Sequence, residues 1–290
     1  GFLEFDNNEM LVKGKVNMMD GRMLVDGTTY FEKKPRLLAK LTCEQIDIRE
    51  FFRQAENFGQ DVLVDKNIKG KLDAKFYIKA FWAEDATFLT DKLHVLGDVG
   101  ILNGELVGLK MLYEFSDYVK LSDLRRIKFT ELHNFMEVKK SKIYMPAMFI
   151  QSNAMNLTVS GSHSFENRID YNVKVNAGQV LLNKFKKHNS KLSPQKAKKK
   201  GWFNLYYRIH GSLEKMVYGS NKKRVKRELK NSAARKRRIQ KELIKQFGTI
   251  VSAKEPTDWE DVIPEYEEQV DENDDGQEDE VEFIDWDSER

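Results

Sequence analysis

"NAMNLTVSGSHSFENRIDYNVKVN", residues 153–176, contains two stretches in which every second residue is apolar, with a polar turn between them. Successive side chains of a β-strand point to opposite faces, so this alternation predicts two antiparallel strands that each present one apolar face. An antiparallel sheet with one apolar face needs a cover, which can be a second sheet, helices or a hydrophobic ligand. The function of this chain therefore depends on what covers these faces.

The same alternation recurs along much of the chain. It is clearest in "KGKLDAKFYIKAFW" (69–82) and in "DKLHVLGDVGILNGEL" (91–106). Two helical patches interrupt it, one at 47–59, where Asp47 is a suitable N-cap, and one at 108–127. The sequence predicts a mainly β fold: an antiparallel sheet with two short helices that are too small to cover it, so that either the sheet curls onto itself or a hydrophobic ligand lies on it.

Turn-forming residues divide the strands. Asp20-Gly21 and Asn103-Gly104 are dipeptides that favour tight hairpin turns. Met145-Pro146 interrupts a strand pattern and predicts an edge position or a bulge, because proline cannot donate to a ladder. One further strand pair is expected in "WFNLYYRIHGSLEKMVY" (202–218).

Charge is strongly segregated, although the net charge is only +3. Residues 1–183 carry 25 basic and 25 acidic side chains, residues 184–245 carry 22 and 3, and residues 255–290 carry 1 and 18. A neutral body is thus followed by a basic segment and an acidic tail.

These patterns divide the chain into three units. Residues 1–218 form the antiparallel β domain, with a lysine-rich linker at about 184–200; residues 221–248 form a basic amphipathic helix; residues 249–290 form an acidic tail with the composition of a disordered segment. The apolar stripe of the helix consists of Val225, Leu229, Ser232, Ile239, Leu243 and Phe247.

The sequence has no membrane-spanning run of about eighteen apolar residues. Its start, "GFLEFDNNEM", has neither an initiator Met nor the pattern of a signal peptide. We expect the sequence to be the C-terminal part of a longer protein, whose missing part would carry any anchor or export signal. Cys43 is the only cysteine, so an intrachain disulfide is excluded and the compartment is left open.

The sequence lacks the residue patterns of catalysis. "SGSHS" (160–164) is not G-x-S-x-G, and on a strand Ser162 and His163 point to opposite faces. There is no G-x-G-x-x-G or Walker-type loop. The five histidines lack paired-ligand spacing: His94, His133, His163, His188 and His210. We expect no catalytic residue, no metal ion and no cofactor, and hence a protein that is not an enzyme.

The basic helix permits three interpretations. In the first, the helix packs its apolar stripe on the β domain. In the second, the helix lies on an anionic membrane surface, where each basic side chain contributes about 1 kcal/mol and the stripe enters the interface. In the third, the acidic residues 255–290 fold back onto the helix. The candidates for membrane contact are Lys222, Lys223, Arg224, Lys226, Arg227, Arg235, Lys236, Arg237 and Arg238.

Nucleic acid is a less favoured partner. The basic segment could contact phosphates, and the aromatic residues of "WFNLYYR" (202–208) could stack on bases. The helix itself, however, has almost no interleaved aromatic residues, and no known RNA- or DNA-binding module is visible.

The alternating apolar side chains have two interpretations. They form the ordinary core of a sandwich or barrel, or they line an open groove that holds acyl chains, in which each buried CH₂ contributes roughly 0.8 kcal/mol. The groove candidates are Leu72, Phe76, Ile78, Leu93, Val95, Val99, Ile101, Met155, Leu157, Val159, Ile169, Tyr171, Val173 and Val175.

Several segments together resemble the C-terminal region of the AsmA family and, more distantly, TamB. They are "LTCEQIDIREFFRQAENFGQ" (41–60), "NIKGKLDAKFYIKAFWAED" (67–85), "LGDVGILNGELVGL" (96–109) and the long stretch 121–175 that begins "LSDLRRIKFTELHNF". The similarity covers roughly residues 37–247 and lies in the order of many weak pieces. The acidic tail is not part of the pattern.

The resemblance implies a periplasmic protein that is anchored in the inner membrane by an N-terminal segment absent from this sequence. It also implies an elongated curved sheet with an apolar groove, and a role in outer-membrane biogenesis and phospholipid transport between membranes. We therefore expect phospholipid, or another lipid with acyl chains, and an anionic membrane surface as partners, and other envelope proteins through the acidic tail. The alternative is a scaffolding β protein of the envelope that holds no lipid.

Overall fold

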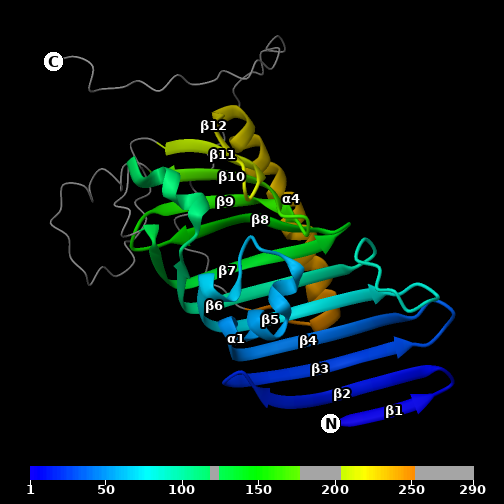
Figure 1. Ribbon diagram of the computed structural model, residues 1–290. Coiled ribbons are helices and arrows are strands. Elements are labelled where there is room, and N and C mark those ends of the chain that lie inside the picture. The colour runs from blue at the N-terminus through cyan, green and yellow to red at the C-terminus, as the bar shows by residue number, and fades with distance from the viewer. Residues whose placement is uncertain (118–123, 177–203, 252–290) are drawn as a thin grey trace, which may run out of the picture.

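The computed structural model describes residues 1–117, 124–176 and 204–251. The described strands form one antiparallel sheet of twelve strands, in which each strand pairs with the next along the chain (Figure 1). The predicted mainly β fold is confirmed. The strands are β1 (Phe2–Asp6), β2 (Glu9–Met18), β3 (Gly21–Tyr30), β4 (Arg36–Asp47), β5 (Ile68–Phe81), β6 (His94–Val107), β7 (Arg126–Lys139), β8 (Lys142–Gln151), β9 (Asn156–Ser164), β10 (Arg168–Asn176), β11 (Asn204–Ser212) and β12 (Met216–Ser220). The helices are α1 (Ile48–Gln54), the short 3₁₀ helices η1 (Glu56–Gly59), η2 (Asp65–Asn67) and η3 (Lys110–Asp117), and α4 (Lys222–Phe247).

The strand registers assign each side chain to one face of the sheet. Cys43, Ala74 and Val99 are paired across β4, β5 and β6, so they stand on one face, whereas Lys75 and Asp98 are paired on the other. We call the first the inner face, because α1 packs on it, and the second the outer face, because α4 crosses it (Figure 1).

The chain between β4 and β5, residues 48–67, covers the middle of the inner face. It begins with the predicted helix, whose N-cap Asp47 accepts a hydrogen bond from the Glu50 amide at 3.1 Å. Near its far end the Asp61 amide donates to Oδ1 of Asn167 at 2.9 Å, and Nδ2 of Asn167 donates to Oδ2 of Asp61 at 2.8 Å. Since Asn167 lies in the turn between β9 and β10, this segment ties β5 to strands much later in the chain.

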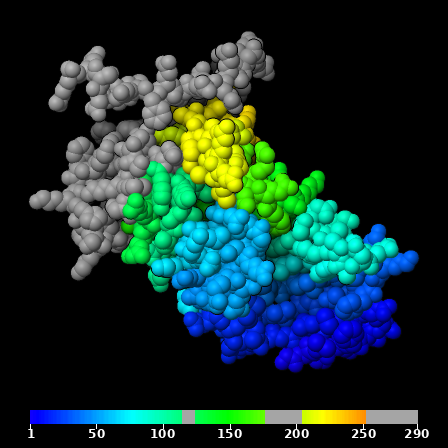
Figure 2. Space-filling model, viewed as in Figure 1, coloured from blue at the N-terminus to red at the C-terminus, as the bar shows by residue number. Residues whose placement is uncertain are grey.

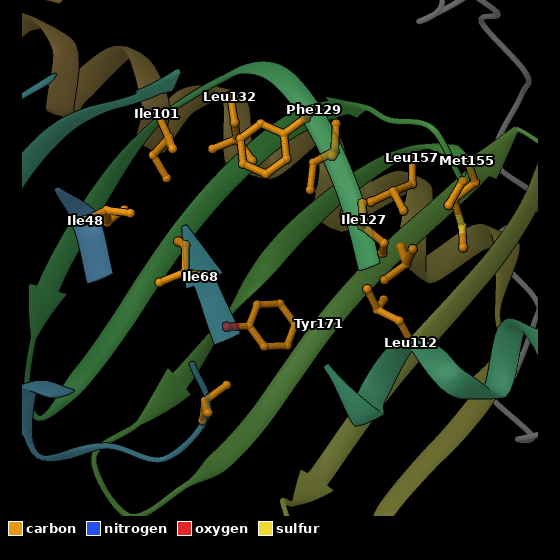
Figure 3. Packing of buried hydrophobic residues seen from close by; sticks show 14 of the residues in the cluster. Ile48, Ile68, Ile101, Leu112, Ile127, Phe129, Leu132, Met155, Leu157 and Tyr171 are labelled. Atoms are coloured by element: carbon orange, nitrogen blue, oxygen red, sulfur yellow. The ribbon is translucent and has the colours of Figure 1, made fainter. Parts of the chain in front are cut away.

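The main core lies between the 48–67 segment and the inner face of β4 to β11. Figure 3 shows Ile68 and Tyr171 directed toward a common space, although they come from β5 and β10. Leu112 of η3 closes the same cluster. The core is therefore built by one sheet with its own inserted segment, and no second sheet is present among the described residues.

α4 forms a separate layer on the outer face, where it contacts β5 to β11. Asn221 caps its N-terminus by accepting from the Arg224 amide at 2.9 Å, and Gly248 ends it in a left-handed conformation. Val225, Ile239 and Leu243 of the predicted stripe are completely buried. The helix that the sequence predicts thus exists, and it packs its stripe on the sheet.

The turn predictions need correction. The hairpin between β2 and β3 is centred on Met19 and Asp20, both with positive φ, one residue earlier than predicted. The prediction of a turn at Asn103-Gly104 is wrong, because strand β6 continues through these two residues. A Cβ on Gly104 would lie 2.2 Å from the Phe129 ring, so the glycine there permits close packing within a strand.

The predicted irregularity at proline is confirmed. The register between β8 and β9 shifts between Met145 and Met148, which marks a bulge at Pro146. The Pro146 carbonyl accepts a hydrogen bond from Nδ2 of Asn134 on β7 at 3.0 Å. A side-chain hydrogen bond from Asn134 thus satisfies the Pro146 carbonyl at the point where the backbone ladder is interrupted. The lysine-rich linker at about 184–200 and nearly all of the acidic tail lie outside the described residues.

Candidate functional site

The inner face changes character at β4. Over β1 to β4 it carries an apolar strip that the 48–67 segment does not bury, and we call this strip the open face. Its most accessible members are Leu3, Phe5 and Val16, with exposed fractions of 64%, 63% and 45%. The register places on it Leu3, Phe5, Met10, Val12, Val16, Val25 and Leu37. Met18, Met23 and Leu41 share this face but pack against the main core and form the border of the strip.

The opposite face of the same strands carries most of their charge. Lys13 and Asp26 form an ion pair at 3.7 Å there, and Arg22 pairs with Glu44. These pairs are exposed and contribute little to stability. Their position shows that β1 to β4 are two-sided, with water on the charged face and an apolar surface on the other. Among the described residues, Phe31 stacks on Phe5 of that surface with 5.6 Å between ring centroids, and Leu3 and Val16 remain exposed.

An aromatic cluster marks where the open face ends. Phe51 of α1 stacks on Phe76 of β5, with 6.2 Å between ring centroids. Phe52 and Phe58 meet edge to face at 5.2 Å, and Phe58 remains 42% exposed. The 48–67 segment, which stands out in the middle of Figure 2, therefore forms an apolar wall beside the dark blue strands β1 to β4.

The structure brings most of the predicted groove residues into the main core, not onto the open face. Nine of the fourteen are at most 9% exposed, namely Leu72, Phe76, Ile101, Met155, Leu157, Ile169, Tyr171, Val173 and Val175. Ile78, Val95, Val99 and Val159 pack against them, and Leu93 precedes β6 outside this cluster. An acyl chain would have to displace core packing to reach these residues, including the 48–67 segment over β4 to β6 and Leu112 of η3.

Sequence reasoning missed the residues of the open face, although their signal was present. In "EMLVKGKVNM" the residues Met10, Val12, Val16 and Met18 fall on one face, and Lys13, Lys15 and Asn17 fall on the other, with Leu11 and Gly14 as the exceptions to the alternation. Alternation identifies an apolar face but does not say whether that face is covered, because the cover comes from residues 48–67.

The nine candidates for membrane contact all lie on α4, where some side chains contact the sheet and others point to solvent. Nη2 of Arg238 donates to Oε2 of Glu137 at 2.6 Å, and Nη1 of Arg235 lies 3.7 Å from the same oxygen. Arg224 lies 3.7 Å from Asp170, and Lys236 lies over the Phe135 ring. The exposed candidates are Lys222, Lys223, Lys226, Arg227, Arg237 and also Arg238, which stays exposed although it pairs with Glu137.

The carboxylates that receive these basic side chains are held in the ionised form. Burial raises the pKa of Glu137, but hydrogen bonds from His94 and Arg238 outweigh burial and lower the pKa to about 2. For Asp170, burial likewise raises the pKa, but the hydrogen bond and charge of Arg208, together with the charges of Arg224 and His210, lower the pKa on balance. The contact of α4 with the sheet is thus electrostatic as well as apolar.

The polar residues near His163 do not form a nucleophile and base pair. Nδ1 of His163 lies 2.6 Å from the hydroxyl of Tyr171 on the inner face, and burial lowers the pKa of His163 to about 4. Ser162 stands on the outer face, as the alternation predicts. Within residues 1–117, 124–176 and 204–251, no three His, Cys, Asp or Glu side chains gather as metal ligands.

No helix in the described part of the chain is long and apolar enough to cross a membrane. No protein-family model, curated protein or solved structure matches the chain.

Proposed function

We propose that this protein is not an enzyme and that it holds or guides the acyl chains of phospholipid along the inner face of its sheet. The observation that carries the proposal is the open face over β1 to β4, an apolar sheet surface on which Leu3, Phe5 and Val16 remain 64%, 63% and 45% exposed. The sequence resemblance supports the wider setting: a periplasmic protein, anchored in the inner membrane, that serves outer-membrane biogenesis and lipid transport between membranes.

The chemistry of the open face suits hydrocarbon without selecting a head group. Met10, Val12 and Val16 offer flexible or branched apolar side chains and no buried polar partner for a ligand. An acyl chain gains roughly 0.8 kcal/mol for each CH₂ that it buries. A lipid lying on this face would keep its head group in water at a strand end.

The direct test combines lipid extraction with one matched pair of variants. Val16→Asp places a carboxylate in the open face, whereas Asn17→Asp adds the same charge one residue later on the outer face. Phospholipid recovered from the purified protein, counted by mass spectrometry per mole of protein, is expected to fall several-fold for Val16→Asp and to stay unchanged for Asn17→Asp.

Two outcomes would reject the proposal. Recovery of no more phospholipid than from an unrelated soluble protein would leave the scaffolding alternative. Equal loss in both variants would mean that added negative charge, not the open face, governs lipid recovery.

A further inference from the structure

The solvent-exposed side of α4 carries positive charge along its whole length. Nine lysine and arginine side chains between Lys222 and Lys245 are exposed, and no aspartate or glutamate of the helix is. We call this surface the basic face. At 1.5 Å per residue it runs for about 35 Å along the helix.

The spacing of these residues makes the basic face unfavourable by itself. Lys222, Lys226 and Lys230 follow one another at intervals of four residues, and a second row with the same spacing runs from Arg237 to Lys245. Side chains four residues apart are neighbours on a helix, and like charges at that spacing destabilise the helix. An acidic partner along the basic face would offset this repulsion.

The packing of α4 limits what an outside partner could gain there. Val225, Ile239 and Leu243 are buried against the sheet, so the apolar stripe cannot enter a membrane interface while the helix is docked. Ile244 is the one large apolar side chain of α4 that is exposed. Phe247, the only aromatic residue of α4, packs against the sheet and offers no platform on which bases could stack. A membrane or a nucleic acid would therefore hold the basic face by charge alone.

The chain that follows α4 is fixed to the same side of the sheet. Lys75 of β5 donates to the Thr249 hydroxyl at 2.7 Å and to the Thr249 carbonyl at 3.0 Å. The Val251 amide donates to Oδ2 of Asp98 on β6 at 2.5 Å. The residues after Val251 therefore leave from a set point on the outer face, at the C-terminal end of the basic face.

The segment that continues from this point complements the basic face in charge. Residues 255–290 carry 18 acidic side chains and 1 basic one. A chain of this length spans up to about 120 Å when extended, more than three times the length of the basic face. Because both belong to one chain, the segment meets the basic face at an effective concentration on the order of millimolar, whereas a separate polyanion has to reach that concentration in solution.

We propose that residues 255–290 bind the basic face of α4 and shield it from other polyanions. The contact is mainly electrostatic, so it weakens as salt is added. It is independent of the proposed lipid function, because α4 crosses the outer face of β5 to β11 whereas the open face lies on the inner face of β1 to β4.

Carbodiimide cross-linking of the full chain tests this proposal, because the reagent joins a carboxylate directly to a lysine in contact with it. Mass spectrometry of the monomer counts the cross-links between residues 255–290 and Lys222 or Lys223, which lie at the end of α4 farthest from Val251. We expect these cross-links at about 0.1 M NaCl and at least a fivefold loss of them at about 1 M, where the screening length falls from about 10 to 3 Å.

Charge reversal separates attraction from the mere proximity of two parts of one chain. Lys226→Glu with Lys230→Glu reverses part of the basic face, whereas Lys33→Glu with Lys34→Glu makes the same change at exposed positions between β3 and β4. The cross-links to the two N-terminal lysines of α4 are expected to fall at least fivefold in the first double variant and to stay unchanged in the second. Circular dichroism checks that each variant folds, and the salt series on the parent protein decides if the first does not.

Co-sedimentation with vesicles distinguishes residues 255–290 from a membrane as the partner of the basic face. We expect the full chain to bind phosphatidylcholine vesicles that contain about 30% phosphatidylglycerol no more than vesicles of phosphatidylcholine alone. Stronger binding to the anionic vesicles that Lys226→Glu with Lys230→Glu abolishes would assign the basic face to a membrane and overturn the proposal. Absence of the cross-links in the parent protein, or cross-links that neither salt nor charge reversal reduces, would overturn it as well.

Discussion

Replacing Glu137 with glutamine removes the negative charge that holds α4 to the sheet while keeping the shape of the side chain. The Glu137 side chain is 2% exposed on the outer face of β7. It receives Arg238 at 2.6 Å and His94 at 3.3 Å, and Arg235 lies 3.7 Å away. Without the carboxylate, Arg238 and Arg235 would be left beside a neutral amide.

The pKa of Glu137 sets the size of the effect. Its fall from 4.5 to about 2 corresponds to roughly 3 kcal/mol of folding free energy, at about 1.4 kcal/mol per pH unit. Because the folded-state pKa lies below the unfolded one, this contribution is fully present above about pH 4.5 and is lost as the pH falls toward 2. At pH 3 roughly 1.5 kcal/mol remains.

Urea unfolding followed by circular dichroism measures the difference in unfolding free energy between the parent protein and Glu137→Gln. We expect about 3 kcal/mol at pH 7 and about half of that at pH 3. Glu131→Gln is the matched control, since Glu131 is exposed on the same strand. Equal stability of Glu137→Gln and parent at pH 7, or a difference that does not change with pH, would refute the electrostatic account of helix docking.

Two further predictions concern the core. Gly104→Ala is expected to lower the unfolding free energy by about 1–3 kcal/mol, because the added Cβ would meet the Phe129 ring. The control Gly219→Ala should change the unfolding free energy by less than about 0.5 kcal/mol, because no atom lies within 4 Å of a Cβ at that position. Thermal unfolding measures both differences. The Cys43 thiol, whose pKa burial and the charge of Asp73 raise to about 12, should react with a thiol reagent only as fast as the protein unfolds, and rapid reaction of the native protein would contradict its buried position.

Local rules account for the part of the fold that the sequence predicts. The alternation in residues 69–82 corresponds to the single long strand β5, Ile68–Phe81. The ends of α4 follow from Asn221 and Gly248, and the start of α1 from Asp47, because caps depend on neighbours within three or four residues. Each of these signals lies within one short stretch.

Contacts between distant residues account for what the sequence does not predict. The Arg238–Glu137 ion pair joins residues 101 positions apart, and Asp61 meets Asn167 across 106 positions. The first helps to hold α4 on the outer face, and the second helps to hold the 48–67 segment over the inner face. Neither pairing leaves a periodic trace in the sequence, so the sequence identifies apolar faces without saying which of them is covered.

The geometry of the open face also limits the mechanism that we propose. A chain of about sixteen carbons, wholly buried in a bilayer, gains roughly 12 kcal/mol, and a face that contacts one side of it recovers about half. Moving such a chain from a bilayer onto β1 to β4 alone is therefore uphill by roughly 6 kcal/mol. Acyl chains lying side by side, or a cover over the strip, would reduce this difference, because each would remove the exposed side of the chain from water. A face of this kind suits guiding chains whose movement is driven elsewhere, because weak one-sided contact does not hold a chain on the face.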